Sequence, residues 1–377
     1  MTQTRVYLDA GGRAPLHPAA REAFLVALDS GWADPRRLHS EGRRARHLLD
    51  GARAEIAAGL GCRVEELHLT PGHTASLHSA VLSMAAGRRR AGNLVVTSAV
   101  ERAAVLAAAR QVDPDGRPVP VDAEARVDLD AWAEAVARPG VALAALQHAN
   151  GEVGTRQPTV AALEACRAAG VPLLVDAGAS VGHVDVGDAW DVLAADPADW
   201  GSPAGVGALA VRSRVRIRPV GPEDEDPWAP GGVSVPHAVA AAAALRAVLT
   251  DRADAADRRR GLVADLRRAI SAIRDVDVLG DPGDRLPHVL TFSCLYVDGE
   301  SLVDALDRRG FAVGSGSACT SSALEPSHVL AAMGALTHGN VRVALARETT
   351  REDVERFAEA VGPAVGSVRA ILGAGEL

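Results

Sequence analysis

The stretch Val-Ala-Leu-Ala-Ala-Leu at residues 141–146 decides the fold class, because it is a short apolar run followed by a longer amphipathic segment at residues 160–169. A second apolar run at residues 172–175 comes next, and residues 93–97 precede a helical pattern at 103–111 in the same way. Strands alternating with helices predict parallel βαβ units, and therefore an α/β fold with a mainly parallel sheet. Such folds place their sites at the carboxyl ends of the strands.

The second half of the chain predicts a smaller C-terminal α/β domain. A long helical stretch covers residues 237–273, and we expect its run of three arginines, residues 258–260, to be a solvated helix face. Strands near residues 288–292 and 341–345 then alternate with helices at 300–309 and 351–372. The acidic, proline-rich residues 219–230 predict an exposed loop.

Composition excludes several classes of protein. The 377 residues are 48% hydrophobic and 23% charged, with a net charge of −8, so a soluble globular protein without a nucleic-acid partner is expected. Residues 1–16 lack a basic region followed by an apolar one, and no apolar run is long enough to span a membrane, so we expect a cytoplasmic protein without a membrane partner. The four widely spaced cysteines match neither a disulfide framework nor a metal site, and no metal is expected.

One amino acid is missing altogether. The chain contains no lysine, so all 40 basic residues counted as Lys+Arg are arginines. A guanidinium stays protonated and cannot form an imine, so no residue of this chain replaces a lysine amine in that chemistry.

A series of short motifs, taken in order, resembles the cysteine desulfurases, which are fold-type I enzymes of the class V aminotransferase family that use pyridoxal phosphate (PLP). The similar segments are residues 6–10, 34–42, 69–74, 97–102, 148–154, 175–180, 231–236, 316–321, 324–330 and 341–342. The resemblance implies a large PLP-transferase-like domain over residues 15–255. It also implies a small domain, residues 1–14 and 256–377, that carries the reactive-cysteine loop. Because the family forms dimers, a dimer is expected, either with itself or with an intact desulfurase.

Some positions that hold the cofactor in the family are retained. Asp176 is similar to the acid that pairs with the ring nitrogen, and Asn150 to a residue that contacts ring and substrate. Thr74 follows Gly72 in a segment that resembles the phosphate loop, although an ordinary helix cap at Thr74 explains it equally well. Arg102 stands where the family has a stacking histidine.

Other positions have changed in ways that oppose PLP binding. The family pattern Ser-x-His-Lys-x-x-Gly-Pro-x-Gly places Asp199 at the imine-forming lysine, Asp196 at the serine and Ala198 at the histidine. Both carboxylates would repel a phosphate. Ala179 and Gly232 likewise replace a glutamine and a threonine of the family patterns.

Two parts of the family's sulfur apparatus remain in the sequence. Cys319 resembles the nucleophile that carries sulfur as a persulfide, and Arg342 resembles the residue that binds the substrate carboxylate. A packed cysteine and a surface arginine are the structural alternatives. The remaining cysteines, Cys62, Cys166 and Cys294, are expected in the core.

These observations leave three hypotheses. The first is an accessory or sulfur-relay partner that performs no PLP chemistry and passes sulfur to an acceptor protein. The second is an active desulfurase or lyase that uses noncovalently bound PLP, the only cofactor we consider. The third is a purely structural subunit.

Overall fold

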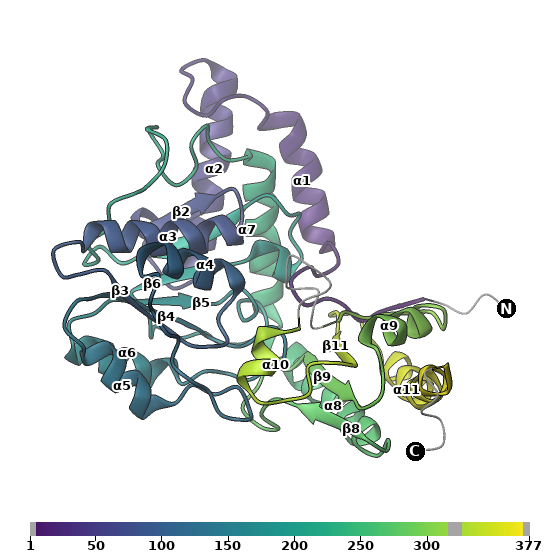
Figure 1. Ribbon diagram of the computed structural model, residues 1–377. Helices are drawn as coiled ribbons and strands as arrows, with labels where there is room; N and C mark the ends of the chain where they lie inside the picture. The colour runs from purple at the N-terminus through teal and green to yellow at the C-terminus, as the bar shows by residue number, and fades with distance from the viewer. Residues whose placement is uncertain (1–4, 316–325, 372–377) are drawn as a thin grey trace.

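The computed structural model describes residues 5–315 and 326–371. A six-stranded sheet with the order β2-β7-β6-β5-β4-β3 forms the centre of the larger part (Figure 1). Its strands are β2 (Leu67–Thr70), β3 (Leu94–Thr97), β4 (Val141–Gln147), β5 (Leu173–Asp176), β6 (Val192–Ala195) and β7 (Gly207–Val211). Strands β3 to β6 pair in parallel, and only β7 runs antiparallel to its neighbours. The expected α/β fold with a mainly parallel sheet is confirmed.

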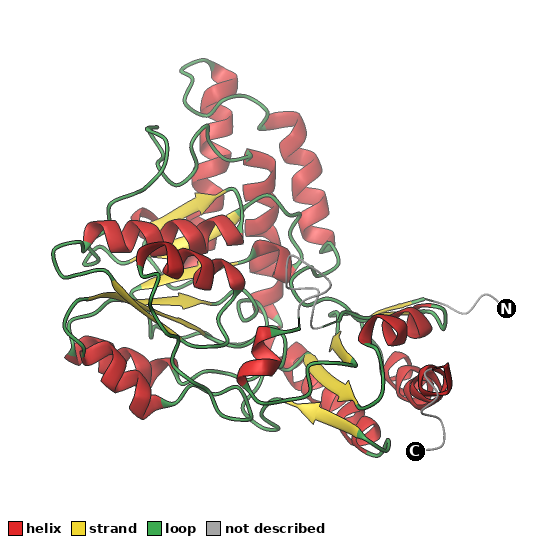
Figure 2. Cartoon of the chain, in the orientation of Figure 1, coloured by secondary structure: helices red, strands yellow, loops and turns green. Residues whose placement is uncertain are grey.

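Helices cover both faces of this sheet, as Figure 2 shows in red. One face packs against α3 (His73–Gly87) and α4 (Ala103–Val112). The other face contributes to a core with α2 (Ser40–Gly59), α5 (Leu129–Ala137), α6 (Thr159–Ala168) and α7 (Val235–Thr250), while α1 (Pro18–Ser30) packs on α7. Because the strands are buried on both faces, they are nearly continuous apolar runs in the sequence.

A second core belongs to the smaller part. The antiparallel sheet β11-β9-β8 consists of β8 (Val276–Leu279), β9 (Val289–Cys294) and β11 (Asn340–Ala344). It packs with α8 (Arg252–Ser271), α9 (Gly299–Asp307) and α11 (Arg351–Ile371), and α10 (His328–Ala332) lies at the side facing the larger part (Figure 1). The N-terminal strand β1 (Val6–Tyr7) pairs with β10 (Phe311–Ala312), which brings the start of the chain into this core.

The long C-terminal helical stretch differs from the expectation in two ways. It divides into α7 and α8, because Asp251 leaves helical geometry at φ −122° and ψ 19°. The run of three arginines is not a uniformly solvated face: Arg259 is fully buried, and its Nε donates to the carbonyl of Ala255. That prediction was wrong for the middle arginine.

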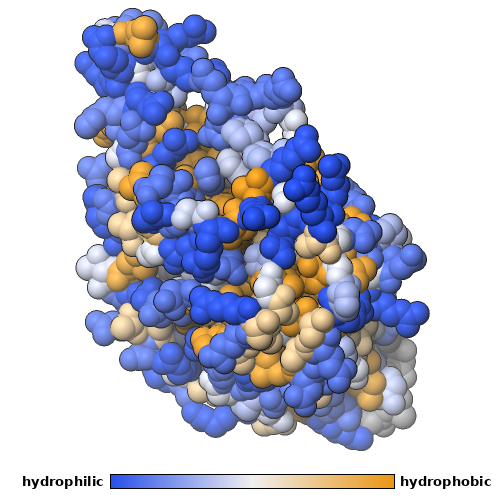
Figure 3. Space-filling view, turned by 90° about the vertical axis from the view of Figure 1, so that its left-hand side faces the viewer, coloured by the Kyte–Doolittle hydropathy of each residue, from blue (hydrophilic) through white to orange (hydrophobic). Residues whose placement is uncertain are grey.

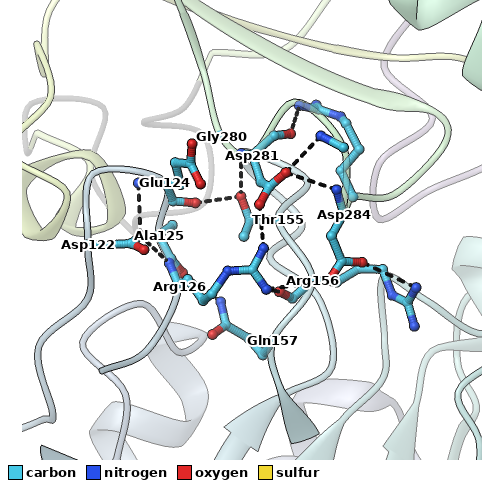
Figure 4. Close-up of polar contacts among 12 residues, drawn as sticks. Asp122, Glu124, Ala125, Arg126, Thr155, Arg156, Gln157, Gly280, Asp281 and Asp284 are labelled. Atoms are coloured by element: carbon cyan, nitrogen blue, oxygen red, sulfur yellow. Dashed lines mark hydrogen bonds and ion pairs between the residues drawn. The ribbon is translucent and has the colours of Figure 1, made fainter. Parts of the chain in front are cut away.

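Polar contacts join the two parts beside the loop that follows β4. Arg126 forms ion pairs with Asp281 and Asp284, and Thr155 accepts from the amide of Asp281 at 3.0 Å (Figure 4). Arg156 also pairs with Asp284 at 3.3 Å. These contacts therefore join the loop after β4 in the larger part to the segment between β8 and β9 in the smaller part.

The surface agrees with the composition. The face shown in Figure 3 is largely hydrophilic, with apolar residues in patches between polar ones. Of the described helices, none has the length and apolar character needed to cross a bilayer. The loop at residues 219–230 is mostly exposed as expected, but Trp228 and Ala229 within it are buried.

Candidate functional site

Asp176 lies at the centre of the candidate site, at the carboxyl end of β5, where it is only 3% exposed. Its Oδ1 accepts from His73 Nε2 at 2.8 Å and from the amide of Gly178 at 2.8 Å. Its Oδ2 lies 2.9 Å from Arg102 Nε. Both carboxylate oxygens therefore face donors that belong to the chain itself.

The electrostatics of this group follow from those partners. Burial opposes ionisation of Asp176, but the nearby His73 and Arg102 outweigh it and hold the pKa of the carboxyl well below its usual range. The Asp176 carboxylate is therefore charged at neutral pH, and it is compensated by the Arg102 guanidinium and by the hydrogen bond from His73.

A glycine at position 178 leaves the space that the contact between His73 and Asp176 requires. A Cβ added at Gly178 would overlap His73 Nε2, so the imidazole reaches Asp176 only because position 178 is a glycine. His73 itself is the residue that the motif analysis missed. The segment 69–74 resembles the family's phosphate loop, whose pattern is Thr-Ser-Gly-Ala-Thr, and His73 stands where that pattern has alanine. This difference was the available signal.

The other expected cofactor contacts are placed as follows. Arg102 caps α4 and joins Asp176, as described above. Asn150 is buried, and its Oδ1 accepts from the amides of Glu152 and Val153 at 2.8 and 2.9 Å, so it holds the turn after β4. Thr74 is exposed in the first turn of α3, and the cap is Gly72, so the alternative of a cap at Thr74 is wrong.

An open groove of about 750 Å³ runs past the N-terminus of α3. Its lining includes His73, Thr74, Asp196 and Gly205. The Asp196 carboxylate caps the short helix η2 (Pro197–Trp200) by accepting from the amide of Ala198 at 3.1 Å, and burial raises the pKa of Asp196. An acidic group thus lies in the groove near the α3 amides that would otherwise attract an anion.

Asp199 does not line that groove. It is 1% exposed and contributes instead to a separate small cavity. Its Oδ1 accepts from the amide of Gly12 at 2.7 Å and its Oδ2 contacts His183 Nε2 at 3.1 Å. His183 Nδ1 in turn accepts from Arg259 Nη1 at 3.1 Å. The residue at the family's lysine position is therefore part of a buried Asp–His–Arg chain.

Ligand atoms of Asp199, His183 and His288 lie within 4.8 Å of one another, which makes them the candidate metal ligands among the described residues. The Arg259 contact argues against a metal there. Arginine only donates, so His183 Nδ1 carries no proton and the neutral ring carries its proton on Nε2, the atom that faces Asp199. A metal would have to displace that proton, and Arg259 would add a like charge next to the ion.

Arg342, which resembles the family's substrate-binding arginine, already has hydrogen-bond partners within the chain. Arg342 lies on β11 and its Nη2 donates to Asp9 Oδ1 at 2.8 Å and to the carbonyl of Gly11 at 3.2 Å. Cys319 lies outside the described residues. On one side of the segment that contains it, Gly314 pairs with the backbone of Arg342; on the other, His328 Nε2 is 2.9 Å from the carbonyl of Glu101. Both flanks thus lie near candidate-site residues.

The remaining cysteines fit the core prediction in part. Cys166 and Cys294 are buried, and burial raises the pKa of each thiol to about 12. Cys62 is half-buried, with a thiol pKa raised by burial to about 11. None of these three described thiols has the lowered pKa of a reactive cysteine.

Comparison with known proteins decides the family, since the family model described as "Aminotransferase class-V" matches residues 6–357. The chain belongs to the class V aminotransferase family. It is 34% identical to a cysteine desulfurase of Cereibacter sphaeroides, with 97% of each protein covered. It is 32% identical to the cysteine desulfurase IscS of Dictyoglomus turgidum, covering 97% of this chain and 96% of that protein.

Solved structures agree on the fold. A NifS-like protein superposes with a TM-score of 0.87 over 97% of this chain and all of that one, at 24% identity. The apo structure of a cysteine desulfurase from Thermococcus onnurineus gives 0.83 at 20% identity, covering 96% of this chain and 95% of that one. Within this family, the buried Asp176–His73–Arg102 cluster and the Asp199–His183–Arg259 chain are the features that bear on function.

Proposed function

We propose that this protein is a cysteine desulfurase-like sulfur-transfer protein that acts as an accessory or relay partner and performs no PLP chemistry of its own. The named relatives support the sulfur-transfer part, because curated cysteine desulfurases match almost the whole chain. The observation that carries the second part is the pairing of Asp176 with His73 and Arg102.

The residues present do not fit PLP. A pyridine ring needs an accessible acid at its nitrogen and an amine for its aldehyde. The acid already binds an imidazole and a guanidinium of the same chain, and the sequence contains no lysine. The groove beside α3 holds the half-buried carboxyl of Asp196 where a phosphate would need only donors. No step of the proposed function therefore passes through PLP.

The relay step requires only a thiol and a persulfide donor. The Cys319 thiolate attacks the terminal sulfur of a donor protein's persulfide, a new S–S bond forms at Cys319, and the donor's S–S bond breaks to leave a thiolate. The sulfur moves without net oxidation, so no further oxidant is needed. The described flanks of the segment that contains Cys319 are tied to Arg342 and Glu101.

Two measurements test the proposal. The purified protein, alone and with added PLP, is expected to show no PLP absorbance after desalting and no sulfide release from L-cysteine. Mixed with a PLP-containing cysteine desulfurase and ³⁵S-cysteine, it is expected to gain one labelled sulfur that is lost in Cys319→Ser and retained in Cys62→Ser. Sustained sulfide release by the protein with PLP would establish the enzymatic alternative instead. If Cys319→Ser gained as much label as Cys62→Ser, Cys319 would not carry the sulfur, and the purely structural role would be favoured.

A further inference from the structure

A small cavity, partly open at the exposed residues Pro15 and Glu348, lies where the two parts of the molecule and the N-terminal segment meet. Its volume is about 20 Å³, enough for one particle the size of a water molecule. The walls come from the N-terminal segment, η2, α7, α8 and the residues that follow β11. The charged or titratable residues that line it are His17, His183, Asp199, Arg259, Arg347 and Glu348.

Two arginines that line this cavity each have a buried guanidinium donor without a partner among the described residues. Arg259 is fully buried; its Nε and Nη1 donate to Ala255 and His183, whereas its Nη2 has no hydrogen-bond partner among the residues that the structure describes. Arg347 pairs through Nη2 with Asp251, and its Nη1 is likewise buried without a partner in the described part of the chain. A buried donor left unsatisfied costs about 1–3 kcal/mol, so two at one cavity call for an acceptor there.

The charges favour an anion over the alternatives. Burial lowers the pKa of Arg259 to about 10, and repulsion from Arg347 is the largest charge effect in the same direction, ahead of the attraction from Asp199. Both Asp199 oxygens already accept from Gly12 and His183. A water would satisfy the donors but bring no charge to compensate Arg259, a cation would add to the repulsion between the two guanidinium groups, and a phosphate exceeds the space.

We infer that this cavity is a binding site for one monatomic inorganic anion, of halide size, held between Arg259 and Arg347. The site lies outside the groove beside α3 and does not depend on the proposed sulfur-transfer function. Since Arg259 belongs to α8, Arg347 follows β11 and Asp199 belongs to η2, a bound halide stabilises the packing of the smaller part on the larger one.

Thermal unfolding tests the inference with chloride as the probe. At constant ionic strength, replacing sodium gluconate with sodium chloride is expected to raise Tm along a saturating one-site curve by a total on the order of 2 °C. Arg347→Met removes one of the two donors while leaving buried Arg259 in place, and is expected to abolish the shift. Arg252→Met is the matched control. Arg252 lies on α8, as Arg259 does, and pairs with Asp185, but it does not line the cavity, so the chloride shift is expected to be retained.

Crystals soaked in sodium bromide give an independent readout, since bromide is expected to produce an anomalous peak between the guanidinium groups of Arg259 and Arg347. Equal Tm values in chloride and gluconate, or a chloride shift that persists in Arg347→Met, would overturn the inference. So would density at the site without a bromide signal, because that result identifies a water.

Discussion

Replacing His73 with leucine tests whether the Asp176 cluster is a structural ionic core. Leucine is apolar and fills comparable space, but it leaves Asp176 Oδ1 with only the Gly178 amide and Oδ2 with Arg102. Removing one hydrogen-bond donor to a buried charged group typically costs about 1.5–3 kcal/mol, because the remaining charge loses part of its compensation. We expect a loss of that size in the free energy of unfolding at pH 7.

A double-mutant cycle separates this pairing from simple loss of packing. In an Asp176→Asn background the charge is already gone, so His73→Leu should cost about 1 kcal/mol, as for an ordinary hydrogen bond. The expected coupling free energy is therefore about 0.5–2 kcal/mol. Urea unfolding of the four proteins at one pH gives the number directly.

His68→Leu supplies the control for that cycle. His68 lies on β2, three strands from β5 in the sheet, and its ring packs against Trp228. At about 4.8 Å per strand this separation is about 14 Å, beyond the range of direct coupling, so His68→Leu and Asp176→Asn should be additive within about 0.5 kcal/mol. A His73–Asp176 coupling no larger than that of the control pair would refute the ionic core.

Three further predictions concern neighbouring groups. Burial raises the pKa of Glu101 to about 8, so the folded protein keeps its proton while the unfolded chain loses it near the usual value. Between pH 5 and 8 the wild type should thus lose about 1.4 kcal/mol of stability per pH unit relative to Glu101→Gln, and parallel urea-derived stability curves would contradict this. Asp199→Lys should destabilise the fold, since Gly12 and His183 lose their acceptor beside Arg259, and mass spectrometry after PLP and borohydride should find no adduct at position 199. Arg126→Met should cost only about 1 kcal/mol by urea unfolding, because its carboxylate partners lie at a partly exposed surface.

The alternation of apolar and amphipathic segments was enough to predict the sheet, because parallel strands buried on both faces produce continuous apolar runs. Residues 141–146 and 172–175 became β4 and β5, and Asp176 ends the second of these strands as the motif predicted. Helix boundaries were less predictable. The break at Asp251 depends on one residue's backbone conformation and leaves no gap in the helical pattern.

The partners of the site residues could not be predicted. His73 and Asp176 are 103 residues apart, and neither residue's local pattern indicates the other. Arg259 was assigned to a solvated face because three successive arginines usually are exposed, yet the chain of contacts to His183 and Asp199 requires it to be buried. Local patterns locate strand ends, whereas charge pairing between them depends on packing that only the folded chain defines.

The substitutions around Asp176 depend on one another, and this dependence bears on how the cofactor site can be regained. His73 needs Gly178, because any side chain there would overlap its ring. Arg102 and His73 together keep Asp176 ionised without a ligand. Asp199 lines the small cavity and not the groove beside α3, so a lysine restored at position 199 would also lose the contacts that Asp199 makes with Gly12 and His183. Reversal at position 199 alone therefore leaves the Asp176 carboxylate paired with His73 and Arg102. Recovery of PLP binding requires at least that His73 and Arg102 be removed together with that change.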